Sequence, residues 1–242
     1  MKFGIVITMF DEHELVLSSI QEIRENCHQA YICVVHSDDN NKTASLEKII
    51  NLVDKYYILP NLALDKNFDA HTLASACIVR NLNKGFSDLY DSGNNFDCVV
   101  ALTADTLMTD STSFARRFGD IKIHNRKAII SQAIGQRFHA TGEGGEFIPE
   151  GRLQSDDITD FACCLFFIEG HFAKKHSAFR NTIISNPYTS EQCLGDELKK
   201  CLDQEKISWS AAVGRLNYAD PHIAYSYNDG VIYHALSGRP GK

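Results

Sequence analysis

The feature that most constrains the fold is a regular alternation of apolar runs and helical patterns over roughly the first 105 residues. The apolar runs are continuous and rich in β-branched residues, as buried strands are. They lie at 3–9 (FGIVITM), 30–39 (AYICVVHSDD), 56–60 (YYILP) and 97–103 (DCVVALT), and the helical patterns lie at 14–26, 43–55 and 70–90. This alternation predicts an α/β fold with a mostly parallel central sheet flanked by helices, whose C-terminal strand ends share one edge.

The second half of the chain follows a looser pattern. The runs AIISQAI at 128–134 and FACCLFFI at 161–168 predict further strands, and short helices are expected near 172–179 and at 190–204. The polar, glycine-rich stretch at 139–157 is typical of a loop that can cover a site. We find no internal repeat and no linker, so residues 1–242 are expected to form a single domain.

Charge and hydropathy exclude several classes of protein. The chain has 24 Lys+Arg against 31 Asp+Glu, a net charge of -7, which disfavours binding to a nucleic-acid backbone. Its eight cysteines contain no CxxC pair, which disfavours a zinc knuckle or a disulfide framework. No transmembrane segment or signal peptide is expected, so a cytoplasmic location is predicted, with association at the inner membrane face as a further option.

Polar side chains gather directly after the predicted strands. Thr8 to Glu12 follow the first strand, His36 to Asn40 the second, and Thr103 to Thr106 the strand DCVVALT. Asp11 and Glu14 also have the spacing of a capping box, which would start the first helix. In a parallel sheet these strand ends converge, and ligands bind at that edge.

Asp105 is the most informative of these residues, since its carboxylate directly follows an apolar strand. It is placed to meet a divalent cation and a diphosphate at the sheet edge. The competing interpretation is a loop aspartate that caps a helix starting near Asp110.

Four segments, in this order, resemble the inverting family 2 nucleotide-sugar glycosyltransferases of the A-type fold. The run GIVITMFDEHE is similar to their opening strand and turn, and YICVVHSDDNN to their second strand with its terminal acids. The run NFDCVVALTADTLMTD is similar to the strand that carries their Asp-x-Asp metal motif. The segment SEQCLGDELKKCL is similar to the acidic segment that supplies their general base.

The resemblance implies a Rossmann-like nucleotide-binding half at 1–106 and an acceptor-binding half at 107–242. It implies transfer of a sugar from a nucleotide-diphosphate donor to a hydroxyl of a saccharide or lipid-linked acceptor, with inversion. Mn²⁺ or Mg²⁺ is the expected cofactor, held by Asp105 and by a C-terminal imidazole, His222 or His234. The residues expected to bind the nucleotide are Thr8, Phe10, Asp11, Glu12, Asp38, Asp39 and Asp105.

Asp196 and Glu197 are the candidates for the general base, with Asp196 preferred and presented by Gly195 at a helix start. The competing interpretation of this pair is a solvated helix face shared with Lys199 and Lys200.

The chain departs from the family pattern at the metal motif, which reads Thr103-Ala104-Asp105 and keeps only its second acid. A catalytically inert sugar- or nucleotide-binding protein of the same fold is therefore an alternative. A nucleotidyltransferase is the other, although ITMFDEHE lacks the glycine-rich, Lys- or Arg-bearing phosphate loop usual in such enzymes.

Overall fold

The computed structural model describes residues 1–38, 44–62, 70–104, 106–108, 110–123, 127–133, 162–184, 190–205, 210–216, 223–227 and 232–235. The strands are β1 (Phe3–Met9), β2 (Tyr31–Asp38), β3 (Lys55–Pro60), β4 (Cys98–Thr103), β5 (Thr106–Met108), β6 (Ala128–Ala133), β7 (Ala162–Glu169), β8 (Ser210–Leu216), β9 (Ile223–Tyr227) and β10 (Ile232–Ala235). The helices are α1 (His13–Asn26), α2 (Ala44–Leu52), α3 (Ala70–Asp91), α4 (Ser113–Ile123), α5 (Gly170–His176) and α6 (Ser190–Glu205).

All of these strands belong to one sheet, in the order β3-β2-β1-β4-β7-β6-β8-β9-β10-β5. The four strands from β3 to β4 are parallel, β7 is antiparallel to both of its neighbours, and β8 is parallel to β6. The strands β9, β10 and β5 pair in antiparallel fashion. The predicted α/β class with mostly parallel central strands is confirmed. The strands β8, β9 and β10 were not predicted from the aromatic C-terminal sequence.

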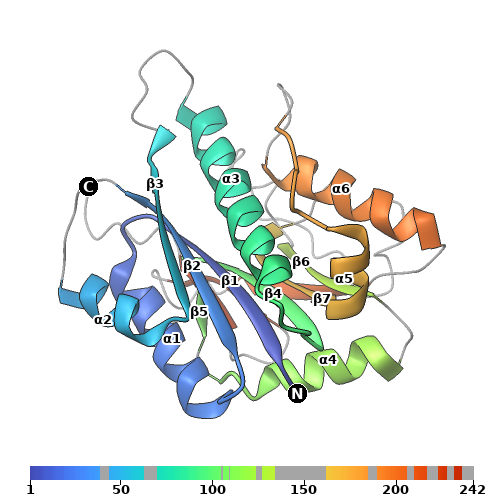
Figure 1. The fold of residues 1–242 in the computed structure, drawn as a ribbon, viewed down its shortest axis with the longest axis horizontal. Helices are drawn as coiled ribbons and strands as arrows, with labels where there is room; N and C mark the ends of the chain where they lie inside the picture. Colours follow the sequence, from blue (N-terminus) through green and yellow to red (C-terminus); the bar gives the residue numbers. More distant parts are fainter. Residues whose placement is uncertain are drawn as a thin grey trace.

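Helices cover the central sheet on both faces (Figure 1). One face packs against α1, α2 and α4, and the other against α3, α5 and α6. Alternation along β1 sends Ile5 and Ile7 into the first core and Val6 into the second, as the period-2 geometry of a strand requires. Both faces of β1 are therefore buried, which explains why its sequence is apolar throughout.

The start of α1 differs from the predicted capping box. The helix begins at His13 and its N-cap residue is Glu12, which makes no side-chain capping hydrogen bond. Glu14 instead accepts a short hydrogen bond from the hydroxyl of Ser45 in α2. Glu14 thus ties two helices together, a tertiary use of the side chain that local spacing does not reveal.

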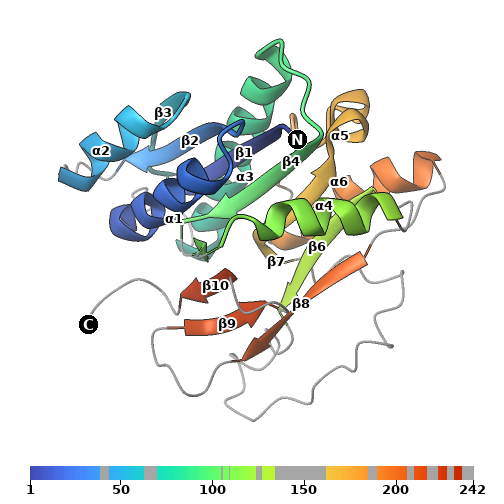
Figure 2. The same ribbon diagram turned by 90° about the horizontal axis from the view of Figure 1, so that it is seen from below.

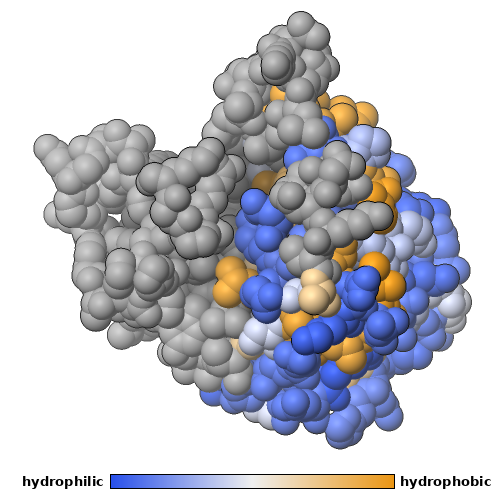
Figure 3. Space-filling model, turned by 90° about the vertical axis from the view of Figure 1, so that its left-hand side faces the viewer, coloured by the Kyte–Doolittle hydropathy of each residue, from blue (hydrophilic) through white to orange (hydrophobic). Residues whose placement is uncertain are grey.

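The side of the molecule that carries α2 and the edge strand β3 has a mixed surface. Figure 3 shows this side as mainly hydrophilic, with hydrophobic groups separated by polar ones. Ile50 of α2 and Ile58 of β3 are 43% and 56% exposed. Within the described part of the chain, these exposed side chains form no continuous apolar surface on this side. None of the described helices combines the length and the apolar character needed to cross a bilayer.

A carboxylate on α3 holds the edge of the sheet through two tyrosines. Asp88 accepts hydrogen bonds from the hydroxyl of Tyr31 at 2.8 Å and from that of Tyr57 at 2.5 Å. The ammonium of Lys84 lies 3.8 Å from the ring centroid of Tyr57. The hydrogen bond to Asp88, followed by burial, raises the pKa of Tyr57 to about 12, and burial together with Asp88 also raises the pKa of Tyr31.

We expect Asp88→Asn to lower the pKa of Tyr57 toward its ordinary value of about 10. A pKa that is raised on folding gives stability that is present below about pH 10 and is lost as pH rises toward about 12. The wild type should therefore lose stability over this window and the variant should lose less. Ultraviolet titration of tyrosinate, with Tyr57→Phe to assign the signal, measures the shift, and an unchanged titration in Asp88→Asn would contradict it.

Candidate functional site

The first part of the candidate site is the C-terminal end of β1. Thr8 pairs with Val35 of β2 and with Thr103 of β4, so it lies at the centre of the parallel strands. It is fully buried, and its hydroxyl has no hydrogen-bond partner among the described residues. A buried hydroxyl without a partner is costly, which is why such groups occur where a ligand or water completes them.

The residues predicted to contact the nucleotide surround this point. Phe10, Asp11 and Glu12 form the turn between β1 and α1, with Asp11 exposed and the other two half-buried. Asp38 is the last residue of β2, where it pairs with Pro60 of β3. The backbone thus brings these positions to one edge of the sheet. Asp39 lies outside the described residues.

A buried imidazole pair lies just inside this edge. The sequence placed His36 among the polar residues after the second strand, whereas it lies within β2, and its pairing with His13 was not predicted. His36 of β2 pairs with Met9 of β1, and its ring centroid is 5.4 Å from that of His13 in α1. The Nδ1 atom of His36 is 2.6 Å from the hydroxyl of Tyr56 in β3. Both histidines are at most 4% exposed. In the sequence, the only indication of this pair was His36 at the end of the apolar run at 30–39. Its neighbour His13 on α1 became evident only from the fold.

A second polar group fixes the ends of β2 and β3 on the opposite face of the sheet. Arg80 of α3 donates to the carbonyl of Pro60 at 2.6 Å and to the hydroxyl of Ser37 at 3.1 Å. Asn81 donates to the same hydroxyl at 2.9 Å and to the carbonyl of Val35 at 3.3 Å. This clamp holds Ser37, which precedes Asp38, and Pro60, which pairs with Asp38 across the strands, so it orients the edge at which the nucleotide is expected.

We expect Arg80→Met to lower the free energy of unfolding by about 1–2 kcal/mol, because the carbonyl of Pro60 loses a charged donor. The methionine keeps most of the apolar stem, so lost packing contributes little. Urea unfolding measures the change. Lys48→Met, at an exposed position of α2, is the control and should leave the midpoint unchanged. Equal midpoints for both variants would show that the clamp does not stabilise the protein.

The predicted metal position lies where β4 ends. Thr103 is the last residue of β4, and its hydroxyl oxygen is 3.3 Å from that of Thr106, the first residue of β5. Asp105, between β4 and β5 in the sequence, lies outside the described residues. The strand β5 pairs with β10 in a register that places His234 opposite Thr106. In Figure 2 the strands β9 and β10 lie below the central strands, which agrees with this pairing.

The register of β10 and β5 was not predicted from the sequence, and it concerns the two residues expected to hold the metal ion. It brings the backbone of His234 opposite the residue that follows Asp105 in the sequence. A carboxylate and an imidazole are donors that Mn²⁺ accepts, so the types of residue fit. Among the described residues alone, no group of three His, Cys, Asp or Glu side chains forms a metal site. His222 lies outside the described residues.

The predicted base residues lie inside a helix rather than at its start. Gly195, Asp196 and Glu197 are all within α6, which begins at Ser190, so the expected helix-start geometry is wrong. The sequence around Gly195 is helical because Leu194 and Leu198 are buried at helical spacing against the second core. Asp196 is exposed and Glu197 is half-buried.

Glu197 lies near the C-terminal end of α3, close enough to act electrostatically on Tyr90. Burial is the main reason for the raised pKa of Tyr90, and the negative charge of Glu197 contributes to it. Tyr90 is the second-last residue of α3, and its hydroxyl donates to the carbonyl of Ala178 at 2.7 Å. The edge at which the nucleotide is expected lies nearer the other end of this helix, because Arg80, ten residues earlier, contacts β2 and β3 at their C-terminal ends. The base roles of Asp196 and Glu197 stay predictions.

Comparison with known proteins identifies the fold of this chain but not a family to which it belongs. No family model matches the sequence, and no curated protein matches it significantly. A crystal structure of S. aureus TarS 1–349 has a TM-score of 0.51 at 12% identity, covering 94% of this chain and 60% of that chain. The mannosyltransferase PcManGT from Pyrobaculum calidifontis, in complex with GDP-Man and Mn²⁺, has a TM-score of 0.50 at 9% identity. That alignment covers 91% of this chain and 59% of the mannosyltransferase.

The chain therefore shares its α/β fold with these two structures, one of which is a mannosyltransferase, as the sequence resemblance implies. The chain spans about three fifths of the length of either structure. A fold shared at this level of identity is compatible with several activities.

Proposed function

We propose that this protein transfers a sugar from a nucleotide-diphosphate donor to an acceptor hydroxyl, with inversion. The observation that carries the proposal is the register of β10 and β5, in which His234 lies opposite Thr106, next in sequence to Asp105. Together with the pairing of Thr8 and Thr103, this register supports a diphosphate and metal site at the carboxyl edge of the parallel strands. The fold shared with glycosyltransferases agrees with it.

The proposal gives the chain one domain with two functional halves. Residues 1–106 bind the nucleotide, through Thr8, the turn from Phe10 to Glu12, Asp38, Asp39 and Asp105. Residues 107–242 bind a saccharide or lipid-linked acceptor and supply the base, Asp196 or Glu197. We place the activity in the cytoplasm, without nucleic-acid partners.

Asp105 and His234 are the residues that would hold Mn²⁺ or Mg²⁺. When bound, such an ion neutralises the negative charge that grows on the departing diphosphate. The carboxylate of Asp105 would bind and orient the cation, and the buried hydroxyl of Thr8 would meet a polar ligand at the neighbouring strand end. A carboxylate base takes the proton from the acceptor hydroxyl on the opposite face of the sugar.

Thr103 favours one alternative, an inert binding protein, because a hydroxyl stands where the metal motif has its first acid. The test is a panel of nucleotide sugars with Mn²⁺, in which binding is measured by calorimetry and turnover by released nucleoside diphosphate. Turnover together with binding supports the transferase. Binding without turnover supports the inert protein, and pyrophosphate release from a nucleoside triphosphate and a sugar phosphate would identify a nucleotidyltransferase.

A further inference from the structure

Three polar rings from three different elements meet just inside the carboxyl edge of the parallel strands. His36 of β2 neighbours both His13, the first residue of α1, and Tyr56 of β3. The rings of His36 and His13 meet edge to face at an interplanar angle of 84°, and the ring centroids of His36 and Tyr56 are 6.1 Å apart. We call His13, His36 and Tyr56 the ring cluster. It joins α1, β2 and β3 beside the residues expected to contact the nucleotide.

His36 occupies a position at which the strand pattern predicts an apolar residue. Val34 and Ile32, two and four residues earlier in β2, are fully buried in the core that packs against α1 and α2, and strand alternation puts His36 on the same face. His36 is 1% exposed. The hydrogen bond between its Nδ1 atom and the hydroxyl of Tyr56, at 2.6 Å, offsets part of the cost of burying a polar ring. Such a bond also fixes the geometry of the groups that it joins, which an aliphatic side chain does not do.

His13 connects the ring cluster to the turn between β1 and α1. It follows Glu12 directly and is 4% exposed. The hydrogen bond that closes the first turn of α1 runs from the N–H of Val16 to the carbonyl of Glu12, at 3.1 Å. A His13 ring held against His36 therefore fixes the point at which the helix starts, and with it the path of the turn that precedes it.

Tyr56 connects the ring cluster to the end of β2. His36 comes two residues before Asp38, the last residue of this strand. The hydrogen bond from His36 to Tyr56 links β2 to β3 through side chains, in addition to the backbone pairing of the two strands. The clamp from Arg80 links the same two strands on the opposite face of the sheet. Polar contacts thus hold the end of β2 from both faces.

We propose that His36 is a positioning residue for the nucleotide. Because it is buried, it acts through His13 on the turn from Phe10 to Glu12 and through Tyr56 on the ends of β2 and β3. The inference rests on the proposed function, since it takes a nucleotide as the ligand of this edge. Residues that are already ordered bind a ligand without a further loss of entropy. Loss of this order should therefore lower nucleotide affinity more than it lowers kcat.

Two substitutions remove the same hydrogen bond from opposite sides. His36→Phe keeps a ring against His13, and Tyr56→Phe removes only a hydroxyl from a half-buried residue, so the second variant should fold even where the first does not. Calorimetry with UDP and with GDP, each in the presence of Mn²⁺, should show roughly two- to ten-fold weaker binding in both variants. The double variant should bind about as well as the weaker single variant, because only one bond is lost.

Amide hydrogen exchange tests the link to the turn without any ligand. The N–H of Val16 should exchange roughly two- to ten-fold faster in His36→Phe and in Tyr56→Phe, because the start of α1 opens more often. The N–H of Cys27, which donates to the carbonyl of Ile23 at 2.7 Å at the other end of α1, should exchange as in the wild type. A change at Val16 alone shows a local effect at the start of this helix.

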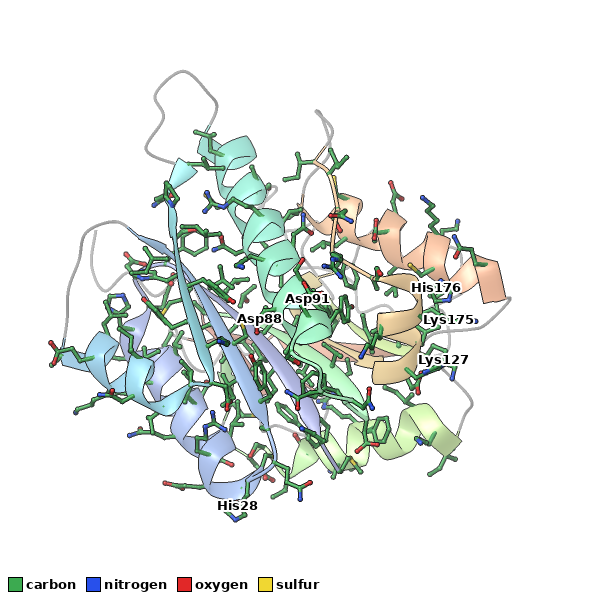
Figure 4. All side chains as sticks on the ribbon, viewed as in Figure 1. His28, Asp88, Asp91, Lys127, Lys175 and His176 are labelled. Atoms are coloured by element: carbon green, nitrogen blue, oxygen red, sulfur yellow. The ribbon has the colours of Figure 1, made fainter. Side chains whose placement is uncertain are left out.

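His28→Phe is the matched control, since it makes the same substitution at an exposed histidine beyond the C-terminal end of α1 (Figure 4). It should keep wild-type affinity and wild-type exchange at Val16. Wild-type binding of UDP or GDP, with either unchanged affinity or unchanged Val16 exchange in both test variants, would overturn the inference alone. A fall in kcat at unchanged nucleotide affinity would also overturn it. Absence of UDP and GDP binding by the wild type would overturn the proposed function and this inference with it.

Discussion

Replacing Gly170 with alanine is expected to lower the free energy of unfolding by about 3 kcal/mol or more. Gly170 is the first residue of α5, and its N–H donates to the carbonyl of Asp97 at 2.9 Å. A Cβ atom at this position would lie 1.9 Å from the carbonyl oxygen of Phe96 and 2.7 Å from its carbon. Both contacts are with backbone, so no side-chain rotation relieves them, and α5 must move away from the sheet.

Gly119→Ala is the matched control for this prediction. Gly119 lies inside α4, and a Cβ atom there meets no other atom within 4 Å. Alanine is the better helix former, so this variant should gain up to about 1 kcal/mol. Denaturant unfolding of both variants measures the difference. Equal stabilities would mean that α5 does not pack this closely on the segment before β4.

The second large effect is on catalysis and nucleotide binding. The proposed function makes Asp196 the general base and Asp105 the residue that holds the cation. Asp196→Asn keeps the size of the side chain and removes the base, so sugar transfer should fall by ~10²–10⁴-fold while nucleotide affinity stays nearly unchanged. Asp105→Ala should instead weaken nucleotide binding in the presence of Mn²⁺, because it removes the charge that holds the cation. Calorimetry and a turnover assay on both variants separate the two effects.

Glu25→Gln, at an exposed position of α1, is the control and should keep full activity. Full activity of Asp196→Asn, with unchanged thermal stability, would show that Asp196 is a solvated helix residue. That result would contradict the assignment of Asp196 as the base. It would agree with the exposed position of Asp196 in the middle of α6.

Much of the fold of residues 1–106 was predictable from sequence because its signals are local. The runs that form β1, β2 and β4 are continuously apolar, since helices cover both faces of these strands. Their alternation with helical patterns is enough to predict parallel pairing and a common edge. The convergence of Thr8, Thr103 and Asp38 at that edge follows from the same rule.

The second half of the fold was less predictable because its pairing is long-range and its strands carry mixed patterns. Nothing near His234 in the sequence indicates that β10 pairs with β5, some 125 residues earlier in the chain. The helix at 190–204 was predicted and is confirmed as α6. The further assignment of Asp196 to a helix start, based on Gly195, is wrong, because Leu194 and Leu198 bury one face and the helix continues through this segment.

The sequence by itself determined the α/β class, the positions of the apolar strands and the polar residues at their ends, since each depends on periodicity within a few residues. Only the tertiary structure decided that His13 lies against His36, that Arg80 holds Ser37 and Pro60, and that His234 lies opposite Thr106. The physical reason is that packing between elements brings these residues together, and hydrophobic burial over the whole fold sets that packing.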